Sequence, residues 1–206
     1  MKMFKDAIVL FLITVVAACA LGAVYEITKG PIEESKTRAK TEAYEKVFGE
    51  IPDPEGLAPC SIPEGFPDQE QFPGSSINEA LVVRDIDGSF LGTILSVTNS
   101  NGYGGDITIA MGVSADGTLK GIEFLEISET AGLGMRAKEE SFLSQFRDVK
   151  TKSFSLPKAK IEGEKEMDAV SSATITSKAV NRAVNAGLLA AAKIRNTYQA
   201  ILIAEY

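Results

Sequence analysis

A run of hydroxyl side chains between Asp168 and Ser177 is the stretch of this sequence best suited to hold a negatively charged group. It reads DAVSSATITS, and an alanine-rich helical pattern begins directly after it. The free N–H groups and the positive dipole end of a helix start favour an anion, and hydroxyls can supply further hydrogen bonds. Two interpretations follow. Thr176 or Ser177 only caps the last helix, or the same helix start also binds an anion.

Two glycine-containing segments are further candidates for contact with a ligand. Asn101–Gly105 reads NGYGG, and Glu129–Met135 reads ETAGLGM just before a predicted short helix. Glycines let the backbone approach a ligand closely, and N–H groups at a helix start bind anions. Each segment is equally consistent with an ordinary turn, because two glycines separated by one residue are a weak signal.

The composition excludes several other kinds of chemistry. The chain has no histidine, which removes the commonest metal ligand and the histidine bases that activate serine or cysteine. Its two cysteines, Cys19 and Cys60, are too few for a zinc or iron–sulfur site built from cysteines. The net charge of −7 argues against binding to nucleic acid. We therefore predict no metal site and no catalytic residue, so any electron transfer depends on a bound cofactor.

The first apolar stretch predicts a membrane-spanning helix. Nineteen uncharged, mostly apolar residues run from Ala7 to Tyr25, and as a helix they are about 28 Å long, close to the hydrocarbon thickness of a bilayer. Lys2 and Lys5 precede this stretch. The positive-inside rule then places the N-terminus in the cytoplasm and the rest of the chain outside.

Two alternatives share this layout. A cleaved signal peptide is similar, and Val16–Cys19 resembles a lipoprotein processing site. We favour a retained signal anchor. The expected organisation is a cytoplasmic N-terminus over residues 1–6, a transmembrane helix over 7–27, a helical stalk over 28–48 and one domain over 49–206.

The patterning after the apolar stretch predicts an α+β fold. Six of the eight prolines lie between Gly49 and Ser76, which is typical of a surface loop. Apolar alternation around Asp87-Gly88 and Asp116-Gly117 predicts two hairpins, and helical spacing predicts the helices. The expected strands are 80–86, 91–98, 106–113 and 119–127, and the expected helices are 137–146, 176–200 and one over 32–48, for whose first turn Pro31 is suited. Together they predict an antiparallel sheet with packed helices.

The candidate segments resemble the motifs of one family. Asp168–Thr174 resembles the flavinylation motif Asp-x-x-Ser/Thr-Gly-Ala-Thr, Glu129–Gly134 resembles the loop Glu-Thr-Pro-Gly-Leu-Gly, and Asn101–Asp106 resembles a Gly-Tyr-x-Gly segment. With a single N-terminal membrane helix, these motifs cover nearly the whole chain. The chain is identified as similar to the G subunit of the Rnf complex and related to the C subunit of the sodium-pumping NADH:quinone reductase, both with an FMN-binding domain.

The resemblance implies that a flavin transferase joins FMN through a phosphoester to the hydroxyl of Thr174. Asp168 then belongs to the motif that the transferase recognises. Further contacts to the cofactor are implied for Ser171, Ser172, Ala173 and Thr176, for Glu129, Thr130, Gly132, Leu133 and Gly134, and for Tyr103 and Gly104. Two positions depart from the family pattern, because Ser172 stands where glycine is usual and Ala131 where proline is usual.

The function implied by the resemblance is electron transfer through covalent FMN in a membrane complex. That complex couples electron transfer between ferredoxin and NAD to the translocation of sodium ions or protons. The chain would act as a redox subunit without an active site of its own, in the cell membrane, with its domain on the extracytoplasmic side. Implied partners are the other Rnf subunits, a flavin transferase and membrane lipid. The alternatives are a quinone-reductase C-like subunit and a non-redox, membrane-anchored binding domain.

Overall fold

The structure, a computed structural model, describes residues 2–49, 51–52, 57–62, 65–157 and 164–204. It divides into two compact units, Met1–Thr41 and Glu42–Tyr206. The last turns of the first helix carry buried side chains that belong to the core of the second unit.

The first unit consists of helix α1 (Lys2–Phe48) up to Thr41. Its apolar side chains are exposed, and α1 contains the one stretch within the described residues that is long and apolar enough to cross a membrane. The sequence led us to expect a new helix at Pro31, but α1 continues through this residue. An interior proline removes one helix hydrogen bond and crowds the carbonyl four residues before it, and α1 accommodates this at Pro31.

The second unit is built on a six-stranded antiparallel sheet with the strands in chain order. The four long strands match the two predicted hairpins, whereas two short edge strands were not predicted. The strands are β1 (Ala58–Pro59), β2 (Ser75–Arg84), β3 (Phe90–Asn99), β4 (Ile107–Ser114), β5 (Thr118–Ile127) and β6 (Val149–Lys150). The predicted α+β class, with an antiparallel sheet and packed helices, is confirmed.

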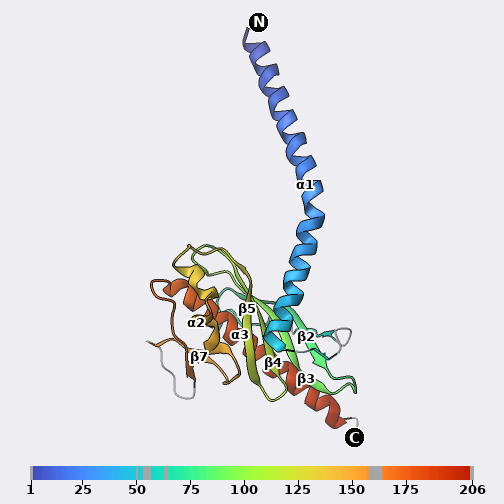
Figure 1. Cartoon of the computed structure of the whole chain (residues 1–206), viewed down its shortest axis with the longest axis vertical. Helices are drawn as coiled ribbons and strands as arrows, with labels where there is room; N and C mark the ends of the chain where they lie inside the picture. Colours follow the sequence, from blue (N-terminus) through green and yellow to red (C-terminus); the bar gives the residue numbers. More distant parts are fainter. Residues whose placement is uncertain (1, 50, 53–56, 63–64, 158–163, 205–206) are drawn as a thin grey trace. The chain divides into compact units, whose positions relative to one another are not determined.

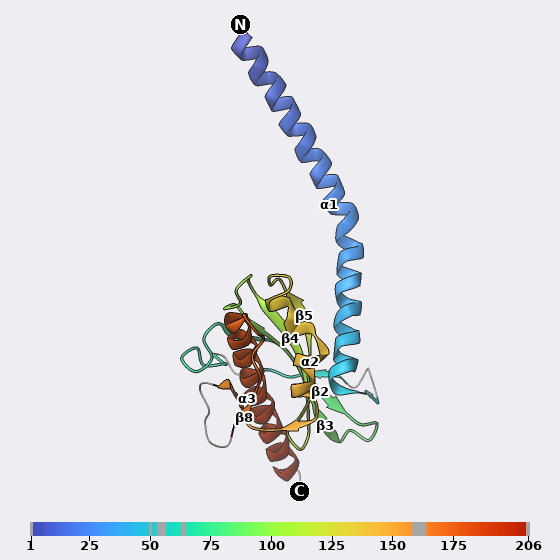
Figure 2. The same cartoon turned by 60° about the vertical axis from the view of Figure 1, so that its left-hand side comes forward.

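Helix α3 (Thr174–Ala204) crosses one face of this sheet, as Figures 1 and 2 show. Alternate residues of each strand face the helix, for example Leu95 and Val97 of β3, while Ile94 faces the other side. There it packs in a second cluster with Tyr44 and other residues from the end of α1. The period of two that predicted the strands therefore reflects a sheet that is covered on both faces.

Short elements connect β5 to α3. The predicted helix over residues 137–146 is divided into η2 (Gly134–Lys138), α2 (Glu140–Leu143) and η3 (Ser144–Phe146). Strands β7 (Phe154–Ser155) and β8 (Lys165–Glu166) form a small parallel pair within a region that the sequence suggested to be irregular. Two-residue strands carry no periodic signal, because a period of two needs at least four residues to be seen.

Candidate functional site

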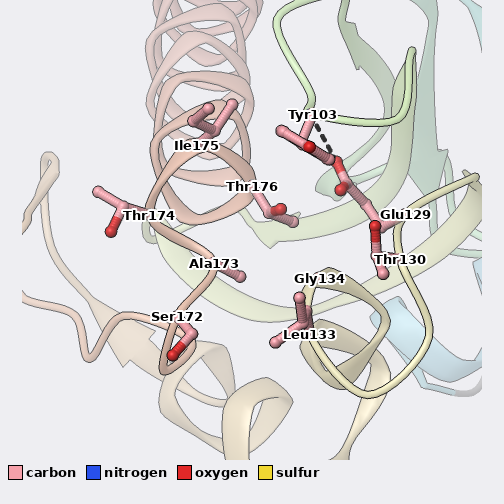
Figure 3. A pocket seen from close by; sticks show the side chains of 10 residues that line it. All are labelled: Tyr103, Glu129, Thr130, Leu133, Gly134, Ser172, Ala173, Thr174, Ile175 and Thr176. Atoms are coloured by element: carbon pink, nitrogen blue, oxygen red, sulfur yellow. Dashed lines mark hydrogen bonds between the residues drawn. The ribbon is translucent and has the colours of Figure 1, made fainter.

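The three candidate motifs meet around one cavity at the start of α3. The cavity has a volume of about 480 Å³, which lies in the range of small-molecule sites. Figure 3 shows the side chains that line it, and they come from the loop before β4, from the segment after β5 and from the start of α3. Its lining is Tyr103, Glu129, Thr130, Leu133, Gly134, Ser172, Ala173, Thr174, Ile175 and Thr176. We call it the motif cavity.

Glu129 fastens the loop before β4 to the segment after β5. Its carboxylate accepts a hydrogen bond of 2.8 Å from the backbone N–H of Tyr103. The loop also lies close to this segment, because a Cβ added to Gly104 would overlap the carbonyl oxygen of Ser128. The glycines of the NGYGG segment thus permit a close approach between two backbones, and the segment is more than an isolated turn.

Gly134 brings the same segment against the start of α3. A Cβ at this position would lie 2.7 Å from the side chain of Glu129 and 2.7 Å from the hydroxyl oxygen of Thr176. Only glycine fits between these two side chains without displacing one of them. Gly132 has a different role, since its φ of +74° is the left-handed conformation that the turn between Thr130 and Leu133 requires.

The start of α3 lies earlier than the sequence suggested, so the predicted N-cap is wrong. The first helical hydrogen bond runs from the N–H of Ser177 to the carbonyl of Ala173, which makes Ala173 the N-cap residue. Ser177 is fully buried, and its hydroxyl donates to the Ala173 carbonyl while accepting from the N–H of Val170. Thr176 lies within the first turn, so neither of the two predicted residues caps the helix.

Two threonines at this helix start face in different directions. Thr176 is 1% exposed, and Figure 3 shows its side chain directed towards Tyr103 and Gly134. The side chain of Thr174 is exposed and lies on the opposite side of the helix start in the same view. As the first residue of α3, Thr174 is next to the N–H groups of the first turn, which have no acceptor within the helix.

The backbone conformation at Ser172 shows why glycine is usual at this position of the motif. Its φ is +61°, in the left-handed region that favours glycine. The turn that precedes Ala173 therefore requires this conformation, and the serine adopts it at a steric cost. The usual glycine of the motif matches a conformational need of this turn.

Most of the predicted site residues line the motif cavity, but some do not. Gly104 and Gly132 shape the loops around it without lining it, and Ile175 lines it although no sequence pattern singled out this residue. Asp168 and Ser171 lie instead at a second cavity of about 180 Å³, which also includes Arg136, Glu139 and Gln145. We call this the Asp168 cavity.

Two ion pairs form within residues 136–147, some of which line the Asp168 cavity. Arg136 forms an ion pair of 3.2 Å with Glu139, and Arg147 forms one of 2.6 Å with Glu140. The guanidinium of Arg147 donates to the Glu140 carboxylate and holds its pKa below the usual value. Within the described residues, no cluster of three potential metal ligands is present.

Comparisons with known proteins identify the same region. The sequence model of the FMN-binding domain family matches residues 102–189, which contain Gly102–Asp106, Glu129–Gly134 and Asp168–Thr174. The chain is similar to the G subunit of the Na(+)-translocating ferredoxin:NAD(+) oxidoreductase complex of Acetobacterium woodii, with 30% identity over 185 residues that cover 88% of both chains. It is also 40% identical over 85 residues to the G subunit of the proton-translocating complex of Clostridium ljungdahlii, across 41% of this chain and 45% of that protein.

Among solved structures, the chain is similar to NqrC of Shewanella oneidensis. The TM-score is 0.47 and the identity 24%, over 72% of this chain and 71% of that one. The apolar helix α1 and the relatives in ion-translocating complexes together indicate a membrane protein. Since the similarity to the Acetobacterium woodii protein extends over 88% of both sequences, the chain belongs to the family of G subunits of ion-translocating ferredoxin:NAD(+) oxidoreductase complexes.

Proposed function

We propose that this chain is an electron-transfer subunit that carries FMN on Thr174 within a membrane complex of this family. Such a complex couples electron transfer between ferredoxin and NAD(+) to ion translocation. The chain supplies the position of the flavin and no active site of its own. FMN, when bound, supplies reversible uptake of one or two electrons. The protein determines where the ring lies and which groups surround it.

The observation that carries this proposal is the meeting of three motifs at one cavity beside an exposed threonine. The motif cavity combines apolar side chains from Tyr103, Leu133 and Ile175 with the hydroxyls of Thr130 and Thr176. A flavin has a flat, largely apolar ring and a polar chain that ends in a phosphate. A site with apolar walls, several hydroxyls and a helix start next to it fits both parts.

Exposure separates Thr174 from the two hydroxyl residues that follow it, Thr176 and Ser177. The hydroxyls of Thr176 and Ser177 belong to residues that are 1% and 0% exposed, so a modifying enzyme cannot reach them in the folded chain. Thr174 is exposed and stands at the first position of α3. A phosphate attached there lies at the positive end of the helix dipole, which stabilises negative charge.

The attachment step requires an activated donor. We propose a flavin dinucleotide, in which the FMN phosphate is bound to a nucleotide through a pyrophosphate bond. The Thr174 oxygen forms a new bond to the FMN phosphorus, the pyrophosphate bond breaks, a nucleoside monophosphate leaves, and the hydroxyl proton passes to a base of the transferase. No electrons are exchanged in this step.

The experiment is co-expression of the full chain with a flavin transferase, followed by denaturing electrophoresis. We expect flavin fluorescence in the protein band and a mass increase that matches FMN without one water. Thr174→Ala is expected to lose both signals, while Thr176→Val, which removes a hydroxyl two residues away, is expected to keep the covalent flavin. Fluorescence that persists in Thr174→Ala would show that another residue is modified.

We also propose that α1 anchors the chain with residues 7–27 in the membrane and that the domain lies on the extracytoplasmic side. The charge distribution supports this orientation, since lysines precede the apolar stretch. Glu166 is exposed, so a Glu166→Cys variant in a background without Cys19 and Cys60 provides a labelling site. Modification by a membrane-impermeant maleimide in intact cells supports the orientation, and modification only after lysis contradicts it.

A further inference from the structure

The segment between Asp168 and Ala173 is held at each end by a side chain from outside it. At its C-terminal end, the buried hydroxyl of Ser177 contacts Val170 and Ala173, as described above. At its N-terminal end, the side-chain amide of Gln145 pairs with the backbone of Asp168. The amide oxygen accepts from the Asp168 N–H at 2.8 Å, and the amide nitrogen donates to the Asp168 carbonyl at 3.4 Å.

Gln145 is itself fixed by its neighbours. It lies in η3 directly before Phe146, which is fully buried and makes edge contacts with the rings of Phe142 and Phe154 at centroid distances of 5.5 and 5.1 Å. Its backbone therefore has little freedom to move relative to the core. The amide joins a rigid part of the domain to the first residue of the flavinylation motif.

The pairing involves only the backbone of Asp168, and the carboxylate takes no part in it. The amide of Gln145 engages both backbone groups of Asp168, while the Asp168 side chain remains exposed at the Asp168 cavity. Two hydrogen bonds to one residue fix the orientation of its peptide groups, which a single bond does not. The bonds fix the backbone at Asp168, from which the chain continues to Thr174.

From this geometry we infer that Gln145 is a positioning residue for the attachment of FMN to Thr174. The inference rests on the proposed function. The transferase must bring the phosphorus of its flavin dinucleotide in line with the Thr174 oxygen, and the pyrophosphate bond breaks as the new bond forms. Misplacement of a reacting group by about 1 Å costs up to about 100-fold in rate. Gln145 touches neither reactant and acts only through the segment that it holds.

The test is the rate of flavinylation of the full-length chain in detergent, with purified transferase and flavin dinucleotide, measured by in-gel fluorescence. Gln145→Met keeps the length of the side chain and removes both hydrogen bonds. Gln145→Glu keeps an acceptor for the Asp168 N–H and removes the donor to the carbonyl. Gln71→Met, at an exposed glutamine before β2, is the matched control.

We expect Gln145→Met to lower kcat of the transferase reaction by about tenfold or more, with KM for the protein changed by less than about twofold. Gln145→Glu is expected to lie between this variant and the wild type, and Gln71→Met to match the wild type. The melting temperature of each variant is measured in parallel. Loss of folded protein lowers the yield of label, but it does not produce a lower kcat together with an unchanged KM.

Two results would overturn the inference about Gln145 and leave the proposed function intact. One is labelling of Gln145→Met at the wild-type rate, and the other is a slower rate that follows the unfolded fraction of the variant. Failure of the wild-type chain to become labelled would overturn the proposed function, and this inference with it. The three results are distinguishable, because the wild type and Gln71→Met are measured in each assay.

Discussion

The two ends of the sheet show how similar loop sequences serve different purposes. At one end, the turns at Asp87-Gly88 and Asp116-Gly117 are closed mainly by hydrogen bonds within a few residues, for example when Asp116 accepts from Ser114 and Thr118. At the other end, Glu129 accepts a hydrogen bond from the backbone N–H of Tyr103, which lies 26 residues earlier in the chain. The first arrangement makes a turn, whereas the second makes the wall of a cavity.

The glycines at the two ends differ in the same way. Gly88 has a φ of +85° and open space where a Cβ would lie, so it is required for its conformation alone. Gly104 is required for space, because a Cβ there would overlap the backbone of Ser128. A composition rich in glycine therefore does not distinguish a turn from a ligand site. The distinction depends on what lies next to each glycine.

The strongest test of this comparison is Gly104→Ala with Gly88→Ala as its counterpart. The first substitution forces two backbones apart and is expected to lower affinity for free FMN by about tenfold or more, and stability by about 1–3 kcal/mol. The second imposes the left-handed conformation on alanine at a cost of about 1–2 kcal/mol and leaves FMN binding unchanged. Fluorescence titration and thermal unfolding measure the two effects. Equal loss of FMN affinity in both variants would contradict the comparison.

Glu129→Ala tests the long-range hydrogen bond at the same end. The Tyr103 N–H loses its acceptor, and we expect a loss of stability of about 1–2 kcal/mol and FMN affinity reduced by about three- to tenfold. Glu129→Gln retains an acceptor oxygen and should remain close to the wild type. If the glutamine variant lost as much as the alanine variant, the negative charge of Glu129, and not its hydrogen bond, would be the important feature.

Ser172→Gly is expected to change stability in the opposite direction to Gly88→Ala. It relieves the left-handed strain of a serine and should raise stability by about 1 kcal/mol, which corresponds to a rise in melting temperature of about 2–4 °C. Differential scanning calorimetry of the protein before flavinylation measures this. A lower melting temperature would mean that the Ser172 hydroxyl stabilises the turn by more than its conformation costs.

The smallest expected effect concerns acid stability at the far end. Hydrogen bonds from Ser114 and Thr118, followed by Lys150, hold the pKa of Asp116 below its usual value. A group whose pKa is lower in the folded state adds stability above its unfolded pKa and loses it as the pH falls towards the folded value. Wild-type stability should therefore fall more steeply than that of Asp116→Asn below about pH 4. The prediction is contradicted if the unfolding free energies of the two proteins change in parallel over this acid range. The FMN content of the two proteins should not differ.

Much of the fold could be predicted because its signals are local. Alternation of apolar residues defines the four long strands, and a 3.6-residue period defines α3. The edge strands β1 and β6 and the pair β7 and β8 could not be predicted, since two residues carry no period. The N-cap prediction failed for a related reason, because several consecutive hydroxyls can each cap a helix and only packing selects where the helix begins.

The apolar helix, the long strands and the three motifs are all encoded in the amino-acid sequence, since each depends on residues that are close together in the chain. The folded chain alone establishes which side of the helix start each hydroxyl occupies, with Thr176 buried towards the cavity and Thr174 exposed. It also establishes that Glu129 contacts Tyr103 and that Gln145 contacts Asp168. These contacts join residues that are far apart in the chain, and no local periodicity encodes such a distance.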